Sequence, residues 1–223
     1  MRSVVTLLFF LCSTSLFSQT IHSVTRKWNK GSVRLTNGEF VSGEISFEET
    51  LGHLQFRKGA AYQLLTPKKV SNFDFTEDDN GTLRQRYFVC AFFKEPEHNL
   101  TVPTFFEVLK ELKDFGFLKK TKVVTSTSIH VPNPYSPTGS NPSKKTRNEE
   151  FYLVTAENNF LLYMTVNRKH KHPDVQEEVL EKVMGTHLPQ VRVFAKSNDL
   201  KFNQKEDFIK ILDYYELLAQ ARN

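Results

Sequence analysis

The chain has 223 residues, of which 39% are hydrophobic and 13% aromatic. This apolar content can fill a core, so a chain that is disordered over most of its length is excluded. The formal net charge of +5 is small for this length and gives no indication of nucleic-acid binding.

Residues 1–18 have the order of a secretory signal peptide. Arg2 supplies the positive start, residues 4–12 carry no charge and are mostly apolar, and small polar residues follow up to Ser18. We expect cleavage after Ser18. Because the apolar run is shorter than the roughly 20 residues that span a bilayer, we expect an exported product without an integral membrane segment.

The cysteine content argues against a disulfide framework. Removal of the signal takes away Cys12 and leaves Cys90, which then has no partner within the chain. Cys90 lies in an apolar, strand-like run, residues 86–93, which predicts a buried and unreactive thiol.

Residues 19–125 are predicted to be rich in β-strands. Five short alternating segments between residues 28 and 75 indicate a β-meander, a small barrel or a strongly curved sheet. Asn37 and Gly38 form a strong hairpin signal, because both tolerate positive φ. Gly43 interrupts an alternating segment and predicts a bulge or a close backbone approach. Residues 83–94 are the next expected strand.

The segment 105–124 carries conflicting local signals. Thr104 and Glu107 have the spacing of a capping box, and Gly116 would end a helix. The competing interpretation is a β-hairpin that turns at residues 113–114. Local signals alone favour the helix, because four apolar residues fall at helical spacing: Phe105, Val108, Leu109 and Leu112.

The second half of the chain contains three segments with different predicted structure. Residues 126–150, rich in Pro, Ser and Lys, are expected to form a disordered loop, and residues 151–172 a β-hairpin that completes the sheet. Residues 173–223 are predicted to be helical, in two to three short helices, with Asn203 and Glu206 as the cap of the last one. Strands followed by helices indicate the α+β class.

Six short motifs are spread over residues 31–215: Gly31-x-Val33-x-Leu35, Gly43-x-Ile45-x-Phe47, Leu65-Thr66-Pro67, Phe105-Phe106-Glu107-Val108-Leu109, Phe151-Tyr152-Leu153 and Ile209-x-x-Leu212-x-x-Tyr215. In these motifs the sequence resembles a group of small exported proteins of unknown function that are common in Bacteroidota-type bacteria. The resemblance implies that segment 105–124 is a hairpin and that the loop 126–150 is a variable insertion. It implies no catalytic residue.

No sequence motif for phosphate binding, serine-hydrolase chemistry or zinc binding is present. Glu107, beside two phenylalanines, is the one carboxylate to inspect as a catalytic group, although an exposed strand position is its expected environment. His170 and His172 form the one close histidine pair, but neighbouring cations disfavour a metal there and indicate an exposed loop. We therefore expect no metal and no cofactor.

Six cations could form a surface-binding patch for an anionic envelope surface, although a solvated face and loop is the simpler interpretation. They are Lys119, Lys120, Lys122, Lys144, Lys145 and Arg147.

The sequence thus predicts an exported, non-enzymatic envelope protein that binds a protein partner or an envelope surface. Periplasmic, outer-membrane-associated and secreted locations all agree with the signal, and the oligomeric state is not indicated. One alternative is a hydrolase that acts on envelope or extracellular substrates. Another is an exported toxin, inhibitor or immunity factor.

Overall fold

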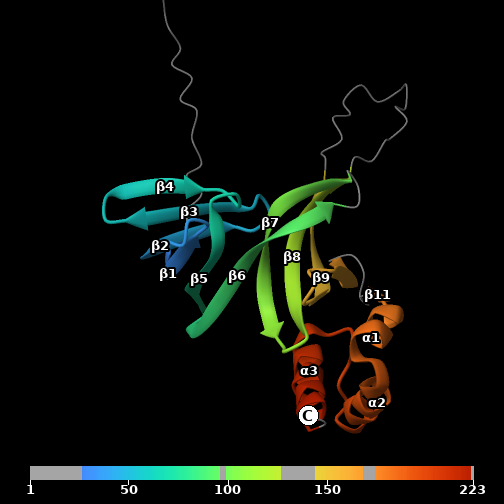
Figure 1. Cartoon of the computed structure of the whole chain (residues 1–223). Coiled ribbons are helices and arrows are strands. Elements are labelled where there is room, and N and C mark those ends of the chain that lie inside the picture. Colours follow the sequence, from blue (N-terminus) through green and yellow to red (C-terminus); the bar gives the residue numbers. More distant parts are fainter. Residues whose placement is uncertain (1–26, 96–98, 127–143, 168–173, 222–223) are drawn as a thin grey trace, which may run out of the picture.

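The computed structural model describes residues 27–95, 99–126, 144–167 and 174–221. These residues form one antiparallel sheet of eleven strands, followed by a helical region at the C-terminal end (Figure 1). The α+β class predicted from the sequence is confirmed. The signal segment 1–18, the histidine pair at 170 and 172, and most of the predicted loop lie outside the described residues.

The sheet is built from β1 (Asn29–Leu35), β2 (Phe40–Glu48), β3 (His53–Lys58), β4 (Ala61–Leu65), β5 (Val70–Asp79), β6 (Thr82–Glu95), β7 (Leu100–Glu111), β8 (Phe115–Ser126), β9 (Lys144–Thr155), β10 (Phe160–Asn167) and β11 (Asp174–Val175). The helices are α1 (Glu177–Met184), α2 (Leu188–Ser197) and α3 (Lys205–Gln220), with a 3₁₀ turn at Gly185–His187.

The strand order is β11-β10-β9-β8-β7-β6-β5-β1-β2-β3-β4. Strands that follow one another in the chain are paired, except that β5 pairs with β1 and not with β4. The described strands therefore form an open sheet, with β4 and β11 at its two edges.

Two glycines show why the N-terminal strands form where they do. Gly38 has a φ of 89° in the β1–β2 turn, a conformation that an L side chain rarely adopts. At Gly43, a Cβ atom would collide with the carbonyl oxygen of Arg57 on β3. The hairpin at residues 37–38 is confirmed, and Gly43 is a site of close backbone approach.

Segment 105–124 is the β7–β8 hairpin, as the resemblance implied, and the helix that local signals favoured is wrong. Phe105 and Phe106 both lie in the interior, in two different apolar clusters. Because successive side chains point to opposite faces of a strand, β7 is covered on both faces. A strand buried on both faces loses the apolar–polar alternation that would have identified it.

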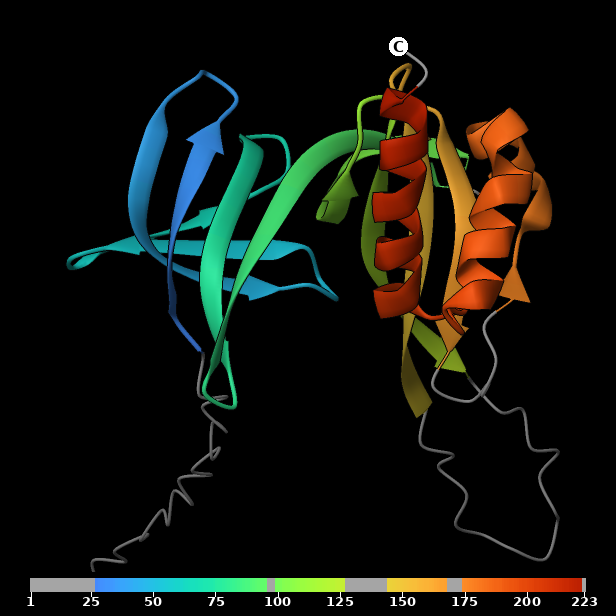
Figure 2. The same cartoon turned by 90° about the horizontal axis from the view of Figure 1, so that it is seen from below.

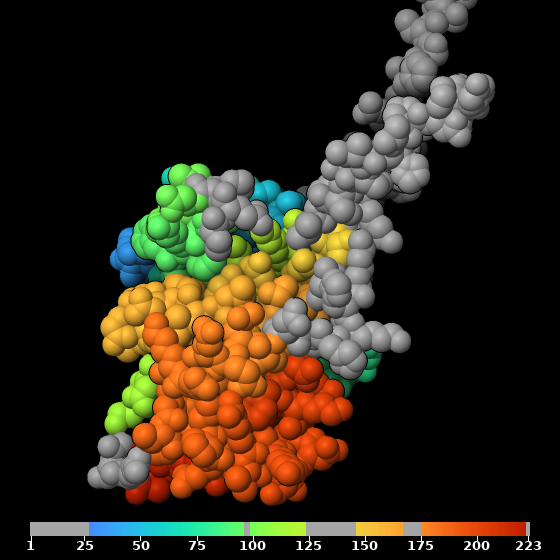
Figure 3. Space-filling model, turned by 90° about the vertical axis from the view of Figure 1, so that its right-hand side faces the viewer, coloured from blue at the N-terminus to red at the C-terminus, as the bar shows by residue number. Residues whose placement is uncertain are grey.

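The described residues form three apolar clusters, and the two larger ones lie at the two ends of the sheet. The N-terminal strands enclose an aromatic cluster that includes Phe73, Phe88 and Phe105. At the other end, α1 to α3 cover one face of β7 to β10, where Phe117 and Phe208 contact each other at a ring distance of 5.0 Å (Figure 2). Seen from the right-hand side of Figure 1, the first C-terminal helices lie directly against strands β9 and β10 and form one continuous surface with them (Figure 3).

Three details differ from the sequence prediction. Asp174 and Val175, assigned to the helical region, form the short strand β11, because they pair with Thr165 and Met164 of β10. Residues 144–150, assigned to the loop, belong to β9, because the register pairs them with residues 120–126 of β8 through backbone bonds that need no apolar side chains. Asn203 does not cap α3. Gln204 holds that position without a side-chain hydrogen bond, and Asp207 accepts a bond from the Lys201 backbone N–H instead.

Candidate functional site

Glu107 lies at the centre of a group of charged side chains on one face of the sheet. It is 2% exposed, so the expectation of an exposed strand residue is wrong. Arg86 Nε donates to Glu107 Oε1 at 2.9 Å and Arg86 Nη2 to Oε2 at 2.7 Å. This is a bidentate interaction between an arginine and a carboxylate. Lys119 Nζ lies 2.6 Å from Oε2.

The strand register brings these three residues together. Glu107 of β7 is paired with Lys119 on β8 and with Phe88 on β6. Arg86 is two residues from Phe88, so its side chain shares that face. The guanidinium carbon of Arg86 lies 4.9 Å from the centre of the Phe88 ring, which adds a cation–π contact at the border of the aromatic core.

Glu49 reaches the same face from the turn between β2 and β3. One of its oxygens lies 2.5 Å from Arg86 Nη2. The other accepts a hydrogen bond from Thr121 at 2.7 Å and lies 2.7 Å from Arg147 Nη2. This carboxylate therefore ties the N-terminal strands to β8 and β9. We name five residues the ion cluster: Glu49, Arg86, Glu107, Lys119 and Arg147.

The electrostatics of the ion cluster keep its acids charged. Burial by itself would raise the pKa of Glu107, but the hydrogen bonds and charges of Arg86 and Lys119 outweigh burial and lower the pKa to about 2. The pKa of Glu49 is also lowered, because Lys119 and Arg86 outweigh its burial. Burial would lower the pKa of Arg86, but the two carboxylates raise it.

The ion cluster borders a polar groove of about 430 Å³. Because both acids and bases line the groove, it has no single sign of charge that would concentrate an ion. The other charged side chains at the groove are Glu48, Glu77, Arg84, Glu149 and Lys205.

This arrangement is suited to holding strands together. A general acid at neutral pH needs a raised pKa, and a base or nucleophile needs a carboxylate oxygen that can reach a substrate. Glu107 has a lowered pKa, and both of its oxygens are engaged by Arg86 or Lys119. The geometry therefore indicates a structural cross-link.

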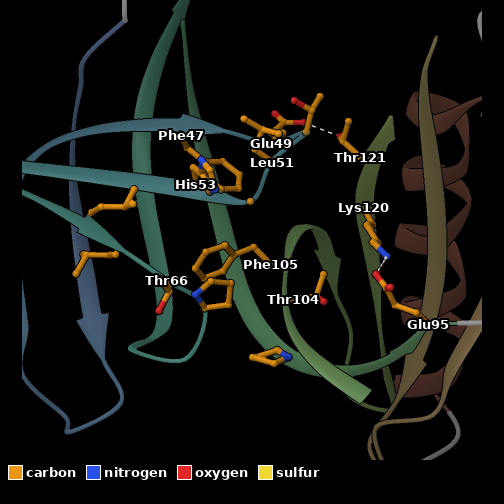
Figure 4. A pocket seen from close by; sticks show the side chains of 16 residues that line it. Phe47, Glu49, Leu51, His53, Thr66, Glu95, Thr104, Phe105, Lys120 and Thr121 are labelled. Carbon is orange, nitrogen blue, oxygen red and sulfur yellow. Dashed lines mark hydrogen bonds and ion pairs between the residues drawn. The ribbon is translucent and has the colours of Figure 1, made fainter. Parts of the chain in front are cut away.

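A second pocket, of about 400 Å³, lies between the β2–β3 turn, the end of β4 and strands β7 and β8. Phe47, His53 and Phe105 project into it, and the Glu49–Thr121 hydrogen bond lies at its border (Figure 4). Lys120 and Glu95 form an ion pair of 3.5 Å at the same pocket. The pocket thus has a mixed lining, in which apolar side chains stand beside threonines and charged groups, and we name it the β4 pocket.

The six predicted patch residues do not all share one face. Lys119 is buried against Glu107, whereas Lys120, the next residue on β8, contacts Glu95 and lies 4.4 Å from the centre of the Phe93 ring. Arg147 is paired with Glu49. Lys122 is partly buried and also has an interaction partner. The register places Lys144 opposite Ser126 and Lys145 opposite Thr125.

The described residues contain no group of three His, Cys, Asp or Glu side chains that could hold a metal ion. Cys90 is a free, half-buried thiol whose Sγ lies 3.1 Å from the carbonyl oxygen of Pro67. Burial raises its pKa, which makes the reactive thiolate rare at neutral pH. None of the described helices has the length and apolar character needed to cross a membrane.

Sequence reasoning identified Glu107 and Lys119 but missed Glu49 and Arg86. Glu49 stands in a turn and Arg86 at the start of an apolar run, so neither carries a local signal. Sequence analysis missed both residues because their partners are distant in the chain. Glu49 and Arg147, for example, are 98 residues apart.

Comparison with known proteins identified no relative of this chain. No protein-family model, no curated protein and no solved structure matches the chain. The function must therefore be argued from the geometry of the chain itself.

Proposed function

We propose that this chain is an exported, non-enzymatic envelope protein that binds a protein partner. Export is supported by the charged, apolar and small-residue order of residues 1–18. The resemblance to small exported proteins of Bacteroidota-type bacteria supports a place in the envelope, either retained there or released outside.

The proposal rests on the burial, the ion pairs and the lowered pKa of Glu107. A hydrolase would need a carboxylate or nucleophile that converges on a pocket with a pKa suited to proton transfer. The carboxylate singled out by the sequence is instead held by Arg86 and Lys119, with its pKa lowered to about 2. This favours binding over catalysis as the role of the fold.

A protein partner is favoured over an anionic surface by the neutralisation of the expected basic patch. Lys119, Lys120 and Arg147 each lie within ion-pair distance of a carboxylate. Apolar side chains, in contrast, are exposed on the N-terminal meander, which we propose to act as a barrel-like binding unit. They include Phe40, Leu51, Tyr62 and Leu64. Leu51 and Leu64 both line the β4 pocket, and exposed apolar side chains that lie close together are typical of protein interaction sites.

Affinity capture tests the proposal. The mature protein, tagged at its C-terminus, is crosslinked in the envelope fraction of the cells that produce it, and captured proteins are quantified by mass spectrometry. We expect one envelope protein to be enriched over a heat-unfolded control. Capture of no protein, together with retention on vesicles that contain anionic lipid, would contradict the proposal.

A further inference from the structure

Glu49 belongs to a turn, but its carboxylate lies in a site that three other strands build. Arg86 Nη2 on β6 donates a hydrogen bond to Glu49 Oε1 at 2.5 Å. Thr121 Oγ1 on β8 and Arg147 Nη2 on β9 donate to Oε2 at 2.7 Å each, and Lys119 Nζ lies 3.8 Å from the same oxygen. Both oxygens are thus bound by charged donors, as those of a carboxylate ligand would be. We name these four donors the carboxylate site: Arg86, Lys119, Thr121 and Arg147.

Most of the carboxylate site is held in place without Glu49. The side chains of Arg86 and Lys119 are 11% and 10% exposed, and they lie 2.7 Å and 2.6 Å from the carboxylate of Glu107. Thr121 is two residues from Lys119 on β8, and Arg147 lies on the paired strand β9. Donors whose positions are fixed beforehand lose little freedom when they bind an anion. We therefore expect the site to persist when the Glu49 carboxylate leaves it.

The turn that carries Glu49 is small and exposed. Residues 49–52 join β2 to β3, and Leu51 is 65% exposed. Gly52 has a φ of 63°, and a Cβ atom there would face open space. The turn is joined to β6, β8 and β9 through the Glu49 side chain. Displacement of that carboxylate would therefore release the turn from these strands.

A carboxylate from outside the chain can reach the site. Arg86, Lys119 and Arg147 line the polar groove of about 430 Å³, and the Arg147 side chain is 40% exposed. On the other side, Glu49 and Thr121 line the β4 pocket, and the hydrogen bond between them lies at its border (Figure 4). A ligand that replaces Glu49 can therefore bring its charged group in from the groove and place an apolar group in the β4 pocket.

The charges around the site indicate the chemistry of its ligand. Among the described residues, Glu49 is the one carboxylate within ion-pair distance of Arg147. Without Glu49, the ion cluster keeps three cations and one acid. Two more acids, Glu77 and Glu149, lie 3.3 Å and 3.7 Å from these cations and are more exposed than Glu49. Because an uncompensated, partly buried cation is costly, the emptied site favours an anion, and its present occupant shows that a carboxylate fits it.

We propose that the carboxylate site recognises an acidic side chain of the partner protein, and that Glu49 occupies the site in the free protein as an internal competitor. When the partner binds, its carboxylate replaces that of Glu49, and an apolar residue beside it enters the β4 pocket. Because Glu49 is tethered, its effective concentration is about millimolar or higher, so a free carboxylate displaces it poorly and the apolar contact is needed. Both competitors use the same donors, so a change at the neighbouring Glu107 affects them alike. This inference rests on the proposed function, because it names the group by which the partner is recognised.

Rescue by a small carboxylate tests the site itself. In the mature protein, Glu49→Ala empties the site, and sodium acetate is the probe at neutral pH, compared with sodium chloride at the same ionic strength. We expect acetate to raise the melting temperature of Glu49→Ala in a saturable way, with a dissociation constant on the order of 10 mM. 3-Methylbutanoate, whose chain can enter the β4 pocket, should bind about tenfold more tightly. The wild type, whose site is occupied, should respond to acetate and chloride alike.

Glu44→Ala is the matched control for the lost charge. Glu44 lies on the same hairpin and pairs with Arg57 at 2.8 Å in an exposed position, so acetate should stabilise this variant no more than chloride does. If Glu49→Ala does not fold, Glu49→Gln takes its place, because the amide keeps the shape and lacks the charge, and the same acetate-specific stabilisation is expected. Equal stabilisation by acetate and chloride in the Glu49 variant, or an equal acetate response of Glu44→Ala, would overturn the inference.

Affinity capture from the envelope fraction connects the site to the partner. Because Glu49 competes with the partner, Glu49→Ala should capture about threefold more of it than the wild type, and 3-methylbutanoate should reduce this gain. Glu44→Ala should capture as much as the wild type. Equal capture by the wild type and Glu49→Ala overturns the inference while the proposed function stands. If neither captures a partner, the proposed function fails and the inference fails with it.

Discussion

Glu107 on β7 and Lys119 on β8 face each other in the strand register, and their charged groups lie 2.6 Å apart in a site where both residues are less than one-tenth exposed. Arg86 on β6 also forms an ion pair with Glu107, so the negative charge of Glu107 is neutralised from both neighbouring strands. The ion cluster thus occupies a position on the sheet that apolar side chains would otherwise fill. Buried charges of this kind are costly unless each is paired.

Replacing Glu107 with Gln should therefore destabilise the protein. The substitution keeps the shape but leaves Arg86 and Lys119 without their shared negative charge, which we expect to cost roughly 3 kcal/mol of unfolding free energy. Urea denaturation followed by circular dichroism measures it. Glu157→Gln, at an exposed position between β9 and β10, is the control and should change stability by less than about 0.5 kcal/mol. Equal effects of the two substitutions would show that the ion cluster is not structural.

Stability should also depend on pH in a defined acidic window. The pKa of Glu107 is about 2 in the folded protein, against an ordinary value of 4.5. The unfolded chain therefore takes up the proton first, and the stabilisation is complete above about pH 5 and is lost as the pH falls toward 2. Glu49, whose pKa is also lowered, acts in the same direction.

The test is the slope of the unfolding free energy with pH in the wild type and in Glu107→Gln. We expect the wild-type slope to be positive between about pH 2.5 and 5, and the variant slope to be smaller, by a contribution that integrates to about 3 kcal/mol. Parallel slopes would contradict the assignment of a lowered pKa to Glu107.

The contact of Glu49 with Arg147 should couple the β2–β3 turn to β9. A double-mutant cycle with Glu49→Ala and Arg147→Ala is expected to give a coupling free energy of about 1 kcal/mol. The exposed pair Arg192 and Glu177, 2.6 Å apart on the helices, is the comparison and should couple by less than about 0.5 kcal/mol. If the two cycles give the same coupling, Glu49 does not tie the two parts of the sheet together.

Two glycines in strands should respond differently to the same substitution. A Cβ at Gly31 would collide with the carbonyl oxygen of Asp74 and lie 2.8 Å from Phe75 Cβ, so Gly31→Ala should cost about 2 kcal/mol or more. At Gly116 the nearest atom would be 3.8 Å away, and Gly116→Ala should change stability by less than about 0.5 kcal/mol. Thermal unfolding of the two variants measures the difference, and a stable Gly31→Ala protein would contradict the close packing of β1 against β5.

The fold was predictable where the signals are local. The first five strands were identified because turn residues such as Gly38 have conformational requirements that the sequence displays directly. The helices α1 and α3 were identified from the helical spacing of their apolar residues. The β7–β8 hairpin was misassigned by local signals because Phe105 and Phe106 are buried in different clusters, which removes the alternation on which strand prediction depends.

The ion cluster was predictable only in part. Glu107 stood out as an isolated carboxylate among phenylalanines, but its burial and its partners depend on the strand register. Arg86 is 21 residues from Glu107, and Glu49 is 37 residues from Arg86. No pattern in one sequence reports such pairings, because they arise when distant strands meet.

We infer that Glu107 has a structural role and propose that the protein acts by binding. Quantitative affinity capture from the envelope fraction tests both statements, with the wild type and with Glu107→Gln compared at a temperature where circular dichroism shows both to be folded. We expect both to capture the same partner to the same extent. A substrate that the wild type converts and that folded Glu107→Gln leaves unchanged would contradict it.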